Sequence, residues 1–129
     1  MTTLQYNPIL AVDSYKFAHQ FSYPANVDGM FSYIEARTQN AKLVMFGLQM
    51  WMKKFLTTPI IKAHIDEAEA FAALHGEPFS RKAWEYIIEK YDGYFPITIR
   101  AVPEGLPIRS SLPLLTSQCD DPEVFWLSS

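Results

Sequence analysis

Hydrophobic residues recur at helical spacing in the middle of the chain, and this spacing predicts helices there. A first long helix is predicted over residues 41–56, with Asn40 as its N-cap and Lys53 and Lys54 in its C-terminal turn. The apolar positions of this segment are Leu43, Phe46, Met50 and, less regularly, Leu56. Their methionine and aromatic content indicates core packing rather than a cofactor site.

Two further helices are predicted toward the C-terminus. One covers residues 61–74 and ends at Gly76, because glycine readily takes the left-handed conformation that terminates a helix. The other begins after Ser80 and is closed by "YDG" (91–93). Its apolar stripe consists of Ala83, Trp84, Ile87, Ile88 and Tyr91.

Strand patterns occupy other parts of the chain. "MFSYIEAR" (30–37) is rich in aromatic and β-branched residues, and "ITIRAV" (97–102) alternates with period two. After turns at "PEG" (103–105) and "RSS" (109–111), "LPLLTSQ" (112–118) is a third strand. Helices and strands are mixed without a repeating strand–helix–strand rhythm. This favours an α+β fold in which helices pack on a small antiparallel sheet.

The final segment, "DDPEVFWLSS" (120–129), carries helix-start signals. Asp121 suits an N-cap and Pro122 suits the first helical position. The chain stops two residues after the apolar cluster, and a helix of about eight residues is marginal unless it is packed. We therefore expect Ser129 to interrupt a larger protein, with Phe125 and Trp126 forming an exposed patch.

Composition narrows the class of protein. With 129 residues, 49% of them hydrophobic and 19% charged, the chain fits one folded domain. The formal net charge is -3 and the basic residues form no run, which argues against a nucleic-acid partner. No apolar stretch approaches the roughly 20 residues that cross a bilayer, and the N-terminus lacks signal-peptide features. The single Cys119 suits a reducing compartment, so we expect a cytoplasmic protein that does not bind membranes.

Catalytic constellations are lacking in the sequence. His19, His64 and His75 do not have metal-ligand spacing, and we expect His64 on a solvated helix face. Cys119 lies beside two carboxylates, which raise rather than lower the pKa of a thiol. There is no phosphate-cradling glycine loop and no nucleophile elbow. We therefore expect neither a catalytic residue nor a metal ligand in this chain.

Binding chemistry is concentrated near the N-terminus. Asp13 or Ser14 can cap a short helix over residues 15–21. The ring of Tyr15 can stack on a planar heteroaromatic ligand, and Asp13 can accept a hydrogen bond from it. The planar guanidinium of Arg37 suits phosphate. A structural alternative stays open, in which Tyr15 is core, Asp13 a cap and Arg37 an exposed strand terminus.

Together, five segments resemble the N-terminal part of the nicotinamide phosphoribosyltransferase family. This family makes nicotinamide mononucleotide from nicotinamide and phosphoribosyl pyrophosphate. The segments are "DSYKFAHQFSYP" (13–24), "FSYIEAR" (31–37), "MFGLQ" (45–49), "WEYIIEKYDGYFPITIRAVPEG" (84–105) and "DPEVFWL" (121–127). They occur in the family's order and cover most of the chain. The more distant nicotinate phosphoribosyltransferases share the general layout.

The resemblance implies a role for the three candidate side chains. Enzymes of this type are homodimers of several hundred residues, with active sites at the subunit interface and Mg²⁺ bound with phosphoribosyl pyrophosphate. Tyr15 would stack on the nicotinamide ring in the partner's site, and Asp13 would line the same pocket. Arg37 would reach phosphate across the dimer. The resemblance assigns residues 1–129 to the N-terminal α+β domain of a type II phosphoribosyltransferase.

Departures from the family pattern set the limits of this expectation. Between Arg37 and "MFGLQ" the chain has only "TQNAKLV" (38–44), which is shorter than in the animal enzymes, and "LPIRSSLP" (106–113) replaces a proline- and glycine-containing turn. The family's catalytic residues belong to an α/β barrel that we expect to lie outside this chain. We expect no Mg²⁺ ligand within residues 1–129. A nicotinate-specific enzyme and a non-catalytic binding or dimerisation module of the same fold stay open as alternatives.

Overall fold

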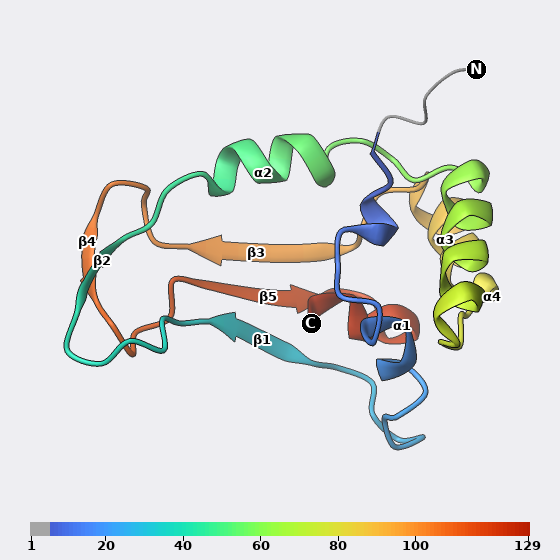
Figure 1. Cartoon of the computed structure of the whole chain (residues 1–129), viewed down its shortest axis with the longest axis horizontal. Helices are drawn as coiled ribbons and strands as arrows, with labels where there is room; N and C mark the ends of the chain where they lie inside the picture. The colour runs from blue at the N-terminus through green and yellow to red at the C-terminus, as the bar shows by residue number, and fades with distance from the viewer. Residues whose placement is uncertain (1–5) are drawn as a thin grey trace. The chain divides into compact units, whose positions relative to one another are not determined.

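Most of the helices belong to one structural unit, and the strands belong to a second unit (Figure 1). A computed structural model describes residues 6–129, and these fall into two units. Unit 1 comprises residues 6–27 and Phe55–Phe95, and unit 2 comprises Asp28–Lys54 and Pro96–Ser129. Each unit is therefore assembled from two segments that lie far apart in the sequence. The assignment of residues 1–129 to one N-terminal domain stays a prediction.

Unit 1 is helical. Its elements are η1 (Pro8–Leu10), α1 (Lys16–His19), α3 (Lys62–His75) and α4 (Arg81–Tyr91). The predicted helix ends are confirmed, because Gly76 caps α3 with φ 71° and Asp92 caps α4 with φ 53°, both left-handed. No helix among residues 6–129 combines the length and the apolar character that crossing a membrane demands.

The core of unit 1 forms where α3 packs against α4 and η1. Its most deeply buried side chains, each at most 2% exposed, are Ile9, Ile60, Ile65, Ala68, Ala72 and Ile87. The guanidinium of Arg81, at the start of α4, binds the carboxylates of Asp66 and Glu69 on α3 at 2.7 Å each. It also binds Glu85 one turn later at 2.8 Å. These contacts join α4 to α3 at the rim of the core.

Unit 2 is built on a three-stranded antiparallel sheet. Its strands, in the order β1-β5-β3, are β1 (Phe31–Ile34), β5 (Leu115–Cys119) and β3 (Ile97–Ala101). In the register of the sheet, Tyr33 lies opposite Thr116, and Ile99 lies opposite Ser117. β1 and β3 fall within predicted strand segments, β5 extends one residue beyond its predicted segment 112–118, and no closed barrel occurs among residues 6–129. The α+β class is confirmed.

The prediction of one helix over residues 41–56 is wrong in its first half. Residues Lys42–Val44 form strand β2, which pairs antiparallel with β4 (Pro107–Arg109). Helix α2 begins only at Leu48 and runs to Phe55, because Gly47 at φ 93° breaks the chain direction between the two elements. The pairing with β4, more than 60 residues away, supplies the backbone hydrogen bonds that local periodicity cannot reveal.

Side-chain exposure corrects the predicted placement of three residues. Phe46 and Met50, predicted to pack in the core, are 86% and 71% exposed. Their helical spacing was counted from Leu43, which lies in β2, so it does not describe one face of α2. At the other end of the chain, Phe125 was predicted to be exposed and is buried at 9%. It belongs to η2 (Pro122–Ser128), which packs against β5.

The predicted N-cap of this last helix is confirmed. The Asp121 carboxylate accepts a hydrogen bond from the backbone N–H of Glu123 at 2.8 Å. The Ser128 hydroxyl donates to the carbonyl of Met30 at 3.2 Å, which fastens η2 to the chain entering β1. A cap at one end and this contact at the other stabilise a short 3₁₀ helix that would be marginal alone.

Candidate functional site

The N-terminal candidate segment folds as a tight turn followed by a short helix. Helix α1 covers only Lys16–His19, and the predicted side-chain cap by Asp13 or Ser14 is wrong. Tyr15 occupies the N-cap position, and its side chain makes no capping hydrogen bond. The backbone carbonyl of Asp13 instead accepts from the N–H of Lys16 at 2.9 Å. Backbone turn bonds satisfy the helix start, so capping does not occupy the Asp13 carboxylate.

The ring of Tyr15 is half-exposed, at 50%, so Tyr15 is not a core residue of the described chain. Its centroid lies 5.2 Å from the His19 imidazole, one turn further along, with 56° between the planes. The Lys16 ammonium lies 5.9 Å from the same centroid. The ring is thus supported by its own helix and retains an accessible surface. A planar ligand could stack on that surface.

The buried side chain of Phe17 anchors this segment in the core of unit 1. Phe17 is 4% exposed and meets Phe79 edge-on, with ring centroids 5.8 Å apart. Asp13 is exposed, and within residues 6–129 its carboxylate has no hydrogen bond or ion pair. A fixed backbone therefore presents an available acceptor two residues before the Tyr15 ring.

Arg37 lies beyond β1, which ends at Ile34. The end of the strand is held by the Ile34 carbonyl, which accepts from the N–H of Leu114 at 2.7 Å. Arg37 itself is exposed, and no side chain in the described part of the chain binds its guanidinium. A guanidinium without a carboxylate partner is available for phosphate.

The three candidates do not belong to one unit. Asp13 and Tyr15 lie in unit 1, where α1 keeps them together, whereas Arg37 lies in unit 2. Their common role in one binding site stays a prediction.

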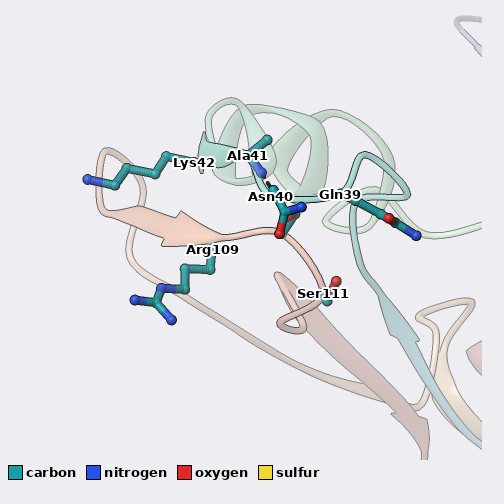
Figure 2. Close-up of a pocket in the computed structure, with 7 residues that line it drawn as sticks. Gln39, Asn40, Ala41, Lys42, Arg109 and Ser111 are labelled. Carbon is teal, nitrogen blue, oxygen red and sulfur yellow. Dashed lines mark hydrogen bonds between the residues drawn. The ribbon is translucent and has the colours of Figure 1, made fainter.

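A pocket that the sequence analysis missed lies in unit 2, where the chain leading into β2 meets the end of β4 (Figure 2). Its volume is about 430 Å³, and it is lined by Gln39, Asn40, Ala41, Lys42, Arg109, Ser110 and Ser111. None of these residues is acidic. Local sequence patterns do not reveal this pocket, because it depends on the pairing of Lys42 with Arg109, two residues far apart in the chain.

His64 is a buried titratable side chain with a structural role in unit 1. His64 is buried, at 5% exposure, and its Nδ1 accepts the backbone N–H of Ile61 at 3.3 Å, so the predicted solvated position is wrong. It shares the inner face of α3 with Ala68 and Ala72, a spacing of four that could have revealed this. Burial lowers the pKa of His64, and the Glu67 carboxylate acts in the opposite direction.

Cys119 is a buried, poorly reactive thiol at the end of β5. Burial raises its pKa; the hydrogen bond with the Asp121 backbone acts in the opposite direction, and the negative charges of Asp121 and Asp120 raise the pKa to a smaller extent. Its Sγ donates to the carbonyl of Asp121 at 3.4 Å. Among residues 6–129, no three His, Cys, Asp or Glu side chains gather in a way that could hold a metal ion.

Comparison with known proteins gives consistent matches. A family profile described as "Nicotinamide phosphoribosyltransferase, N-terminal domain" matches residues 7–99. A nicotinamide phosphoribosyltransferase of Xanthomonas campestris pv. campestris is 40% identical over 124 residues, covering 95% of this chain and 26% of the relative. A nicotinamide phosphoribosyltransferase of Acinetobacter baylyi is 27% identical over 143 residues, covering 95% of this chain and 28% of the relative.

These alignments run over nearly the whole of this chain, which spans only about a quarter of the length of the curated relatives it matches. The profile match includes all three candidate side chains, Asp13, Tyr15 and Arg37. The chain therefore belongs to the nicotinamide phosphoribosyltransferase family and corresponds to its N-terminal domain.

Proposed function

We propose that this chain is the N-terminal part of a pentosyltransferase of NAD salvage. The reaction forms nicotinamide mononucleotide and pyrophosphate from nicotinamide and phosphoribosyl pyrophosphate. The observation that carries the proposal is the family match over residues 7–99, which spans the accessible ring of Tyr15 and the unpartnered carboxylate of Asp13. The relatives' names support nicotinamide, rather than nicotinate, as the base.

The chemistry of the reaction explains why an accessible tyrosine is useful. Displacement at the anomeric carbon of ribose develops oxocarbenium character as pyrophosphate leaves, so the planar base must be held in line with that carbon. Stacking of the base on Tyr15 would contribute about 1–3 kcal/mol, as is typical of aromatic–base stacks. Asp13, two residues before Tyr15, would accept a hydrogen bond from the base or its substituent.

Arg37 would anchor phosphate through its planar fork of donors. Magnesium that accompanies phosphoribosyl pyrophosphate would neutralise part of the phosphate charge. We assign it no ligand among residues 6–129.

The site is proposed to be shared in a cytoplasmic homodimer. Tyr15 and Asp13 of one subunit would then complete the base pocket of the other, while the barrel of the full-length enzyme supplies the remaining groups. This arrangement makes the chain a contributor of binding residues and assigns it no catalytic residue.

The test uses the full-length enzyme with Tyr15→Ala, and Tyr15→Phe as the matched control. Losing the stack should raise the KM for nicotinamide roughly 5- to 150-fold, corresponding to about 1–3 kcal/mol. The melting temperature should change little, because half of the side chain is already exposed. The phenylalanine variant keeps the ring and should retain nearly normal KM.

Two results would contradict the proposal. If Tyr15→Ala lowers melting temperature and activity in parallel, then Tyr15 has a packing role. A substrate panel decides the within-family alternative, because turnover of nicotinate in preference to nicotinamide would identify a nicotinate-specific enzyme.

A further inference from the structure

We infer that the pocket between the β2 and β4 segments is a binding site for a small polyphosphate anion, with Lys42 and Arg109 as its cationic ligands. The pocket contains none of the residues assigned to the proposed function, and the inference does not depend on that function. Its chemistry rests on the charge, register and surroundings of two side chains.

The first observation is a pair of like charges in direct register. Lys42 of β2 and Arg109 of β4 are opposite partners of an antiparallel ladder. Opposite partners project from the same face with their Cβ atoms about 4.5–5.5 Å apart, and like charges there repel each other. In Figure 2 both side chains extend toward the left of the view, Lys42 from β2 and Arg109 from β4. An anion between them would turn this repulsion into attraction.

The second observation is that no acidic side chain neutralises the pair. None of the residues that line the pocket is an aspartate or a glutamate. Neither the Lys42 ammonium nor the Arg109 guanidinium has a hydrogen bond or ion pair with any residue between 6 and 129. Both are exposed, so the ammonium and guanidinium groups can reach a ligand.

The third observation is that neutral donors complete the lining on a fixed backbone. The amides of Gln39 and Asn40 and the hydroxyl of Ser111 border the same pocket. Two hydrogen bonds join the residue before β2 to the residue after β4. The N–H of Ala41 donates to the Ser110 hydroxyl at 3.1 Å, and the N–H of Ser110 donates to the Ala41 carbonyl at 2.9 Å.

These features define the ligand class. A guanidinium fork, an ammonium and several neutral donors suit an anion rich in acceptor oxygens. A volume of about 430 Å³ exceeds what a single phosphate needs and lies within the range of small-molecule sites. Two cations in an acidic chain of net charge -3 do not form a nucleic-acid track. A diphosphate group fits these requirements.

The experiment titrates inorganic pyrophosphate, without metal, into the 129-residue chain by calorimetry at constant ionic strength. We expect saturable 1:1 binding and a melting temperature that rises with ligand. Lys42→Gln and Arg109→Gln should each weaken binding about tenfold or more, because each removes a charge-assisted hydrogen bond. Arg109→Lys, which keeps the charge and loses the fork, should be intermediate. Arg100→Gln and Lys82→Gln are matched controls that should bind as the wild type does.

The outcomes are decisive in either direction. Absence of saturable binding, or equal weakening by the control variants, would overturn the inference. Loss of binding with Arg37→Gln alone, while Lys42→Gln and Arg109→Gln bind normally, would place the anion at Arg37 and also overturn it. The melting temperature without ligand checks folding independently. Because Lys42→Gln and Arg109→Gln each remove one of two repelling charges, the melting temperature without pyrophosphate should be unchanged or higher. Only the rise in melting temperature on adding pyrophosphate should disappear.

Discussion

His64 illustrates how a single residue acquires its properties from its surroundings. Its Nδ1 accepts the N–H of Ile61 just before α3, and its carbonyl accepts the Asn7 side chain at 2.7 Å. Asn7 also donates to Glu67 at 3.0 Å and is itself 6% exposed. Protonation of Nδ1 would remove the acceptor that Ile61 needs. The neutral form of the buried imidazole therefore stabilises the start of α3.

This environment predicts a pH dependence of stability. The folded pKa of His64 lies below the ordinary 6.5, so the unfolded chain takes up the proton first. The contribution of His64 is fully present above pH 6.5 and is lost as the pH falls toward the folded pKa. Denaturant unfolding at about pH 7.5 and about pH 5.5 should show the loss.

The matched variants are His64→Gln and His75→Gln, the second at the exposed end of α3. His64→Gln should flatten the decline in unfolding free energy, and His75→Gln should preserve it. If wild type and His64→Gln decline in parallel, then the pH dependence arises elsewhere.

At the scale of elements, Gly93 joins the end of α4 to the segment before α3. Its carbonyl accepts the N–H of Ile60 at 2.9 Å, and its φ is 82°. A Cβ at this position would overlap the Ile60 backbone carbonyl. Glycine is required here both for its left-handed conformation and for the close approach of two backbones.

Gly93→Ala should therefore destabilise the chain by roughly 3 kcal/mol, which combines left-handed strain with a backbone clash. Gly105→Ala is the matched control, because Gly105 has φ 86° and a Cβ added there would meet no atom within 4 Å. That variant should cost about 1–2 kcal/mol from conformation alone. Chemical denaturation measures both values. Equal losses would show that the contact between Gly93 and Ile60 contributes nothing.

Elements also differ in how well the sequence predicts them. Helices α3 and α4 end where glycine and aspartate permit left-handed residues, and both ends are visible locally in the sequence. Strands β2 and β4 contain three residues each and exist through their mutual pairing. Their partners are remote in sequence, and short segments have almost no periodicity of their own.

At the scale of the whole molecule, the proposed function divides a catalytic site between this chain and other parts of the enzyme. The described residues offer exposed binding side chains at Tyr15, Asp13 and Arg37, whereas the buried His64 and Cys119 serve the two cores. We expect the 129-residue chain alone to form no nicotinamide mononucleotide from nicotinamide and phosphoribosyl pyrophosphate.

A product assay with the full-length enzyme as positive control checks this expectation. Folding of the isolated chain is verified in the same sample by circular dichroism. Appreciable turnover by the chain alone would refute the half-site proposal, because the catalytic groups would then have to lie within these residues.

The sequence by itself determined the α+β class, the ends of α3 and α4, the Asp121 cap and the family. These features depend on residue type and local spacing, or on motifs such as "DSYK" (13–16) and "AVPEG" (101–105). Only the tertiary structure decided the burial of Phe125, the exposure of Met50 and the pairing of Lys42 with Arg109. These features arise from contacts between segments distant in the chain, and local periodicity does not specify them.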